Sequence, residues 1–166
     1  AVVSRGLGDV YKRQGVDVST QGQKIVIIDL EKRSVIYSDS INYDIDLPKY
    51  NTLNGVLKDT DFGVSESNPN MWIDSLHLLF ERLKTSSDII QSIKAISIAG
   101  QQHGLVAIDK DGNLAKSTSK LWNDFSTAEE CEILTKEIGG SEQMITEVAN
   151  SQRTGYTASK IFHMYR

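Results

Sequence analysis

The sequence predicts an α/β fold in which helices flank a mixed sheet, and three observations support this prediction. Short apolar segments separated by polar turns occupy residues 15–38, a pattern typical of an antiparallel meander. An amphipathic helix pattern begins after residue 68, and a further apolar strand pattern follows it. Strands and helices that alternate in this way indicate a sheet covered by helices.

Three strands are expected in the first part of the chain. Residues 15–18 form the end of the first, and residues 24–30 (KIVIIDL) form the second because they are rich in β-branched side chains. A polar turn at 31–34 leads into a third strand at 35–38, which pairs back on the second. Residues 39–67 are polar and without a regular period, so we expect a long loop region that carries at most short strands.

The clearest helix signal starts at Asn68-Pro69. Asn is a favoured N-cap residue, and Pro suits the first helical position because its missing N–H is not needed there. Apolar residues then recur at helical spacing, at Trp72, Leu76, Leu79, Phe80 and Leu83. The helix is expected to fade at residues 85–87.

Further strands are predicted at 93–99, 105–108 and 120–122, with a turn at Asp109–Gly112 between the last two.

Three helices are predicted after these strands. A capping box, Ser126–Glu129, starts the first, and Gly139-Gly140 ends it. The other two begin at Ser141 and Thr157. A three-stranded meander followed by a helix, more strands and more helices is the layout of a ribonuclease H-like lobe, as in actin-like ATPases. Fold alone does not give a function.

Composition excludes several functional classes. The 166 residues are 39% hydrophobic, which suits one domain. The net charge is −4 and no basic stripe occurs, which argues against nucleic acid as a partner. Apolar runs such as Ile25–Ile28 are far shorter than the roughly 20 residues of a membrane helix. The single cysteine, Cys131, rules out a disulfide framework, favours a reducing cytoplasm, and is expected to be a buried structural thiol.

Residues 1–14 do not match the pattern that follows them. They carry three basic residues and one acidic residue, and the stretch just before Gly15 is mostly polar where a strand would be apolar. We therefore expect a non-native or disordered leader over 1–14 and a domain over 15–166.

A hairpin with phosphate-binding chemistry follows the first strand. Asp17, Ser19, Thr20 and Lys24 place a carboxylate, two hydroxyls and an ammonium around Gly22. Backbone N–H groups, hydroxyls and a cation can hold phosphates, and a carboxylate can hold magnesium. Taken alone, an ordinary polar turn is the commoner explanation, because these are also the usual turn residues.

A second polar group joins the strands at 93–99 and 105–108. Gln101, Gln102 and His103 lie between Gly100 and Gly104, and their amides and imidazole can hydrogen-bond several hydroxyl groups of a sugar or polyol. A plain glycine-bounded connection is the alternative.

Trp122, Asn123 and Asp124 either face the same cleft or serve the core and the approach to the next helix, and both interpretations stay open. We expect Glu66 to be a solvated loop acid, and His77 and His163 to lie on plain helix faces. No zinc-ligand spacing is present.

Five segments in order resemble the N-terminal domain of FGGY carbohydrate kinases. They are Asp17–Lys24, Glu66–Trp72, Ile98–Gly104, Leu121–Asp124 and Gly155–Lys160. The Gln-x-His-Gly form followed by Trp-Asn-Asp resembles the xylulokinases more than the glycerol kinases. The resemblance covers residues 15–166. Each motif is weak alone, and their order gives them weight.

The resemblance implies an activity and the residues that serve it. The γ-phosphoryl group of ATP would pass to the terminal hydroxyl of D-xylulose and give D-xylulose 5-phosphate. Residues near the ATP phosphates and Mg²⁺ would be Asp17, Ser19, Thr20 and Lys24, with Asp17 as the metal ligand. Residues that line the sugar pocket would be Gln102, His103, Asp124 and Gly155. Kinases for ribulose, gluconate or glycerol, and a non-catalytic sugar-binding domain, are the alternatives.

The resemblance also implies a second lobe that carries the general base, so no catalytic base is expected before Arg166 and this part alone should not turn over. The partners implied are a small-molecule sugar and ATP, with no nucleic acid or membrane, and a homodimer of the full-length protein stays open. Ser19 replaces the family's glycine, which would weaken ATP binding if that position needs a positive φ. Ser159 replaces the usual proline.

Overall fold

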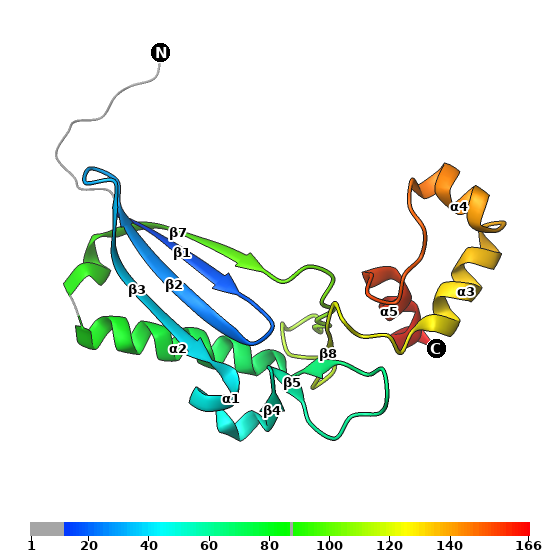
Figure 1. The fold of residues 1–166 in the computed structure, drawn as a ribbon, viewed down its shortest axis with the longest axis horizontal. Coiled ribbons are helices and arrows are strands. Elements are labelled where there is room, and N and C mark those ends of the chain that lie inside the picture. The colour runs from blue at the N-terminus through cyan, green and yellow to red at the C-terminus, as the bar shows by residue number, and fades with distance from the viewer. Residues whose placement is uncertain (1–11, 87) are drawn as a thin grey trace, which may run out of the picture.

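The main sheet has four strands in the order β3-β2-β1-β7 (Figure 1). The computed structural model describes residues 12–86 and 88–166. The strands are β1 (Lys12–Val18), β2 (Gly22–Asp29), β3 (Ser34–Asn42) and β7 (Ile93–Gly100). β1 pairs antiparallel with β2 and parallel with β7, and β2 pairs antiparallel with β3. The predicted mixed sheet is confirmed.

β1 includes Lys12–Gln14, which were expected to belong to the leader, and it ends at Val18, in the stretch 15–18 that was predicted as the strand's end. Lys12–Gln14 continue the pairing with β2 and β7 on both sides, so the backbone hydrogen bonds hold the strand despite its polar side chains. Gln14 is buried although it is polar, which is why a count of apolar residues missed it. Residues 1–11 of the expected leader lie outside the described residues.

Helix α2 (Pro69–Ser86) covers one face of the sheet (Figure 1). Its start is as predicted, with Asn68 Oδ1 accepting a hydrogen bond from Asn70 N at 2.9 Å. The core forms between this helix and the strands, and its buried residues include Val16, Ile25, Ile27, Ile41, Tyr43, Met71, Leu79 and Leu83. Every second residue of β2 is buried, and so is one stripe of residues along α2. These two buried faces pack against each other and form the core.

The expected loop between residues 39 and 67 is more regular than predicted. β3 runs on to Asn42, and short elements follow it: α1 (Tyr43–Asp46), η1 (Pro48–Tyr50), β4 (Thr52–Leu53), β5 (Val56–Leu57) and β6 (Glu66–Ser67). The Asp44 carboxylate organises this segment, because it accepts hydrogen bonds from Thr52 Oγ1 at 2.7 Å and from Asn54 N at 2.6 Å. Such local side-chain bonds leave no periodic apolar pattern to detect.

After η2 (Asp88–Ser92) and β7, the strand expected at 105–108 is not formed. Only isolated bridges occur there, between Leu105 and Lys120 and between Ile108 and Leu114. The turn at Asp109–Gly112 is confirmed by the hydrogen bond from Gly112 N to Asp109 O. The short strand predicted at 120–122 lies at Ser119–Lys120 as β8, which pairs with β6.

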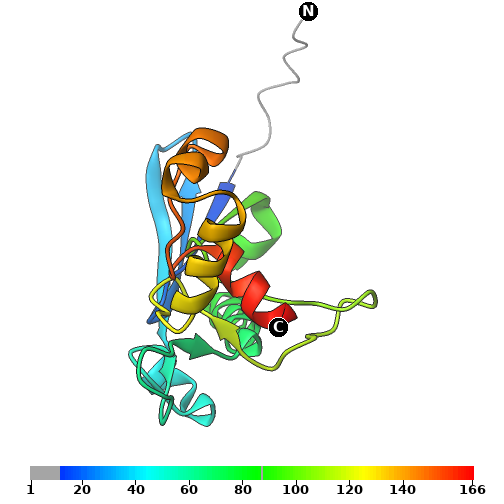
Figure 2. The same ribbon diagram turned by 90° about the vertical axis from the view of Figure 1, so that its right-hand side faces the viewer.

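Three helices lie beyond the carboxyl ends of β1 and β7 (Figures 1 and 2). They are α3 (Ala128–Glu137), α4 (Ser141–Val148) and α5 (Thr157–Tyr165), and the last two start where predicted. The capping box predicted for α3 is wrong: Thr127 is the N-cap without a side-chain cap bond, and the Ser126 hydroxyl donates to Asp124 instead. Within the described ranges, no helix has both the length and the apolar character of a membrane span.

Packing between α2 and the sheet predicts a clear difference between two substitutions in that helix. Leu79→Ala removes a fully buried side chain and should lower the free energy of unfolding by about 2–5 kcal/mol. Ile73→Ala, at a position that is 53% exposed, should change it by about 0.5 kcal/mol or less. Urea unfolding of both variants measures the difference, and equal small losses would contradict this packing.

Candidate functional site

The parallel pairing of β1 with β7 brings two predicted motifs to one edge of the sheet. Val18, the last residue of β1, pairs with Gly100, the last residue of β7. Gln101 N then donates to Val18 O at 3.1 Å. The β1–β2 turn and the loop 101–104 therefore start side by side at the carboxyl ends of parallel strands, where α/β folds commonly bind ligands.

Thr20 links three of the motif segments through its hydroxyl. It donates to Gln101 Oε1 at 3.4 Å and accepts from Trp122 Nε1 at 3.0 Å. The phosphate-side turn, the loop after β7 and the segment after β8 are thereby joined at one atom. Thr20 was predicted for the phosphates, and the structure also gives it this connecting contact.

Ser19 closes the β1–β2 turn. Its backbone N–H and its hydroxyl both donate to Gly22 O, at 3.0 and 2.9 Å. Six non-glycine residues with positive φ occur in the described part of the chain, and Ser19 is not among them. A serine is therefore accommodated here without backbone strain.

Asp17 and Lys24 form a cross-strand pair at the base of the same turn. Both are exposed, on the sheet face opposite α2, where they line a shallow hollow of about 160 Å³ together with Gly15 and Val26. The described residues contain no cluster of three or more His, Cys, Asp or Glu that would form a metal cage. One exposed carboxylate does fit a magnesium ion that takes its other ligands from phosphate and water, as is usual for this ion.

Gln102 and His103 present their side chains to solvent beside this turn. His103 has a positive φ of 60°, which is uncommon for a residue with a side chain. Its ring packs against that of Tyr156, with centroids 4.8 Å apart. The loop therefore holds one imidazole in a defined position next to an exposed amide, so both donors and acceptors are available for hydroxyl groups.

Gly155 brings the segment before α5 against the segment after β8. A Cβ atom at this position would lie 2.5 Å from Trp122 O, so only glycine permits the approach. Gly155 therefore lies directly against Trp122, and its place in a sugar pocket stays a prediction.

Asp124 differs from the expectation that its carboxylate lines the sugar pocket, because it has no exposed surface. One of its oxygens accepts from Ser126 N and Ser126 Oγ, and the other accepts from Ser65 N at 2.8 Å, with Lys120 Nζ at 3.4 Å. Burial raises the pKa of this carboxyl, but the hydrogen bonds and the Lys120 charge outweigh burial, and the net pKa is lowered.

The core interpretation is therefore wrong for Trp122, whereas Asp124 lies at the approach to the next helix as that interpretation placed it. Trp122 is 50% exposed and reaches Thr20, whereas Asp124 is enclosed at the approach to α3. The sequence signal for the latter was the neighbouring Lys120 and Ser126, which can reach a carboxylate at position 124.

Glu66 is not a solvated loop acid. It lies in β6 with 13% of its side chain exposed and pairs with Lys116 at 3.1 Å and Lys120 at 3.4 Å. Burial raises the pKa of Glu66, and hydrogen bonds from Thr118 and Lys116 more than offset this rise. His163 lies on a helix face as expected, next to Glu130 at 3.1 Å.

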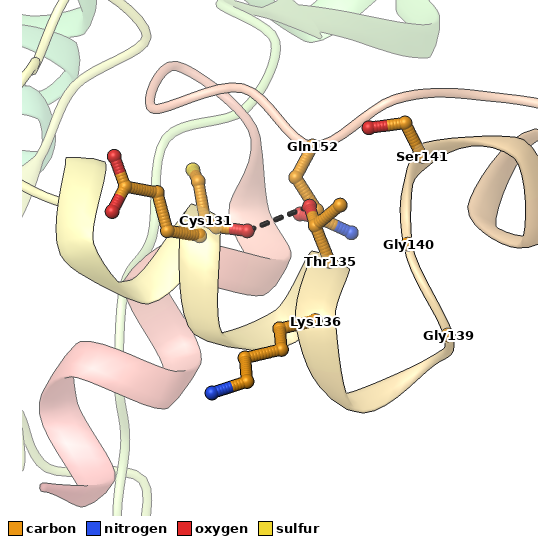
Figure 3. Close-up of a pocket in the computed structure, with 8 residues that line it drawn as sticks. Cys131, Thr135, Lys136, Gly139, Gly140, Ser141 and Gln152 are labelled. Atoms are coloured by element: carbon orange, nitrogen blue, oxygen red, sulfur yellow. Dashed lines mark hydrogen bonds between the residues drawn. The ribbon is translucent and has the colours of Figure 1, made fainter.

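A separate hollow of about 780 Å³ lies between α3 and the start of α4 (Figure 3). Cys131, which is half-buried rather than fully buried, lines it together with Lys136, Ser141 and Gln152. None of the residues predicted to bind phosphate or sugar lines this hollow. It is therefore separate from the site built by the β1–β2 turn and loop 101–104.

Sequence reasoning gave no role to Lys160, and it did not foresee the contacts that Gln101 and Trp122 make with Thr20. All three belong to segments that the motif order had singled out. The sequence signal for these residues was that each lies within a motif. The sequence did not show which of their side chains are buried.

Because the Asp124 carboxylate is buried and hydrogen-bonded, we expect Asp124→Asn to lower the free energy of unfolding by an amount that depends on pH. Because the folded pKa is lowered, the carboxylate contributes stability above its ordinary pKa of 3.8, and this contribution is lost as the pH falls through the folded value. At pH 7 the substitution should cost about 1–3 kcal/mol.

Urea unfolding from pH 3 to 7 tests this expectation, with Asp111→Asn in an exposed turn as the matched control. The difference from the wild type should shrink below pH 4 for position 124 alone. A difference that stays constant over the whole range would contradict the assigned contacts.

Comparison with known proteins shows the family of the chain. Residues 13–164 match the N-terminal domain of the FGGY family of carbohydrate kinases. The xylulose kinase of Schizosaccharomyces pombe is 36% identical over 166 aligned residues, which cover 89% of this chain and 29% of that protein. The xylulose kinase of Rattus norvegicus is 34% identical and covers 89% of this chain and 32% of its own length.

Solved structures show the same fold. A xylulose kinase from Rhodospirillum rubrum superposes with a TM-score of 0.74 at 19% identity, covering 93% of this chain and 29% of that one. A gluconate kinase from Lactobacillus acidophilus gives a TM-score of 0.73 at 20% identity, covering 95% and 29%. The predicted ribonuclease H-like, actin-like fold class is confirmed. The chain spans about a third of the length of these relatives, and it belongs to the FGGY family of carbohydrate kinases.

Proposed function

We propose that this chain supplies the sugar-binding part of an ATP-dependent kinase that converts D-xylulose to D-xylulose 5-phosphate. The observation that carries the proposal is the junction at Thr20, which joins a phosphate-type turn to a polar loop at the carboxyl ends of β1 and β7. The similarity to xylulose kinases supports a pentulose as the sugar.

In this proposal the sugar lies against the loop 101–104. Gln102 and His103 offer an exposed amide and imidazole that can donate to and accept from its hydroxyls. Gly155 lets the segment before α5 approach the segment after β8, and these two segments together with the loop 101–104 form what we call the sugar wall. Asp124 acts by holding the sugar wall in place, since its carboxylate is enclosed. Direct contact between Asp124 and the sugar would require the bonds to Ser65 and Ser126 to break.

ATP would lie on the side of the β1–β2 turn. Asp17 would provide one carboxylate ligand to Mg²⁺, and Lys24 would provide a positive charge to the phosphates. Ser19 and Thr20 would orient the turn, because their hydroxyls are held by Gly22 O, Gln101 and Trp122. The bound nucleotide supplies the γ-phosphoryl group that is transferred.

The remaining catalytic group is proposed to lie outside this chain. A general base that takes the proton from the attacking hydroxyl is expected beyond Arg166, in a second lobe that closes the cleft. The exposed apolar strand β7, where Ile96 and Ile98 are 52% and 61% exposed, supports further packing at this edge. We expect the full-length protein to act on small molecules in the cytoplasm, either as a monomer or as a homodimer.

Other sugars remain competing substrates because the fold is shared with a gluconate kinase. Discrimination among polyols depends on a few hydroxyl contacts. A non-catalytic sugar-binding role is the alternative of a different class.

ADP release by the full-length protein tests the activity. With ATP and Mg²⁺ present, release should depend on D-xylulose and should exceed that seen with ribulose, gluconate or glycerol. Coupled detection of ADP over this panel measures it. Strong release with another sugar alone would reassign the substrate, and equal release with and without any sugar would refute a sugar kinase.

His103→Ala tests the sugar wall. Loss of one hydrogen-bonding group should raise the KM for the sugar about 10-fold to 100-fold and leave the KM for ATP within about 2-fold. His77→Ala, on the exposed face of α2, is the matched control and should behave as the wild type. An unchanged sugar KM in the His103 variant would show that the pocket lies elsewhere.

A further inference from the structure

Lys160 is a fully buried lysine in the first part of α5. Side chains in a helix lean toward its N-terminus, so this one reaches back over the first turn. Its Nζ donates to three backbone carbonyls: His103 O at 2.6 Å, Leu121 O at 2.7 Å and Gly155 O at 2.7 Å. A buried ammonium with three short hydrogen bonds has no donor left for any other partner.

The three carbonyls come from three segments that are distant in sequence. His103 belongs to the loop after β7, Leu121 follows β8, and Gly155 precedes α5. The Leu121 segment leads directly to Asp124, whose N–H donates to Leu121 O at 3.1 Å. Every residue predicted to line the sugar pocket therefore lies on, or next to, a segment that Lys160 holds.

Only the charged form of Lys160 can make all three contacts, because a neutral amine has two N–H donors. Burial lowers the pKa of Lys160, whereas the charge of Asp124 favours the ammonium and that of Lys120 opposes it. The carbonyl oxygens supply the local negative partial charge that a buried ammonium needs.

His103 shows what this arrangement achieves. Its left-handed backbone conformation is unfavourable for a residue with a side chain and has to be held by its surroundings. Lys160 holds its carbonyl, and Tyr156, next to Gly155, holds its ring. The backbone and the ring of His103 are thus fixed by Lys160 and Tyr156, which both lie at the start of α5.

We propose that Lys160 is a positioning residue that fixes the three segments of the sugar wall, and through them the orientation of His103, without touching the sugar. This inference rests on the proposed function for its effect on catalysis, and on the hydrogen bonds alone for its effect on the structure.

The test compares Lys160→Met with Ser159→Ala in the full-length protein. Met keeps the length of the side chain but removes the charge and all three donors. Ser159 is its equally buried neighbour, bonded to Thr127 and to Tyr156 O, so Ser159→Ala perturbs the same helix start without touching the three carbonyls. Lys160→Arg, which keeps the charge and several donors, serves as a milder variant if the Met variant does not fold.

Two readouts are needed. Hydrogen–deuterium exchange should speed up at least 10-fold in residues 101–104, 121–124 and 153–156 of Lys160→Met, or to a smaller extent in Lys160→Arg, with the β1–β2 turn unchanged. The KM for D-xylulose should rise about 10-fold or more, with the KM for ATP within about 2-fold. Ser159→Ala loses bonds to Arg153 O and Tyr156 O, so it should affect exchange at 153–156 only, with exchange at 101–104 and 121–124 and both KM values unchanged.

The outcomes separate the two proposals. Faster exchange in all three segments from a protein that phosphorylates no sugar would support the positioning role and refute the proposed function. Unchanged exchange in these segments, or equal rises in both KM values, would overturn the positioning role even if the wild type is an active kinase.

Discussion

The parallel pairing of β1 with β7 is the constraint on which the rest of the site depends. It sets Val18 beside Gly100, so the turn after one strand and the loop after the other begin at the same edge. Neither segment alone carries a site, since each resembles an ordinary polar connection. Thr20 then contacts both Gln101 and Trp122, which adds the segment after β8 to the same edge.

Enclosed polar groups support the exposed ones. Gln102 and His103 face solvent, whereas Lys160 and Asp124 are fully buried and have their polar atoms bonded to backbone and side chains around them. A buried charge is tolerated only when it is paired and hydrogen-bonded, so these groups fix the segments in one arrangement. A preorganised wall of this kind suits recognition of a polyol, whose many hydroxyls demand defined positions of donors and acceptors.

Sequence patterns predicted the periodic parts of this fold well and the polar parts poorly. The sheet, α2 and the starts of α4 and α5 followed from apolar periodicity and terminal residues. The polar start of β1 was not predicted, and the strand predicted at 105–108 is not formed. In both places tertiary hydrogen bonding, rather than local propensity, decides the structure. Motif order singled out segments that the structure brings together. It could not tell that Asp124 is enclosed and Trp122 half exposed, since burial depends on Lys120, Ser65 and Ser126 meeting in space.

The most direct test of the central claim is a crystal structure of the full-length protein with D-xylulose bound. The account predicts sugar oxygens within about 2.7–3.2 Å of the Gln102 and His103 side chains, with Lys160 still bonded to its three carbonyls. A sugar bound away from the loop 101–104, with that loop in solvent, would contradict it.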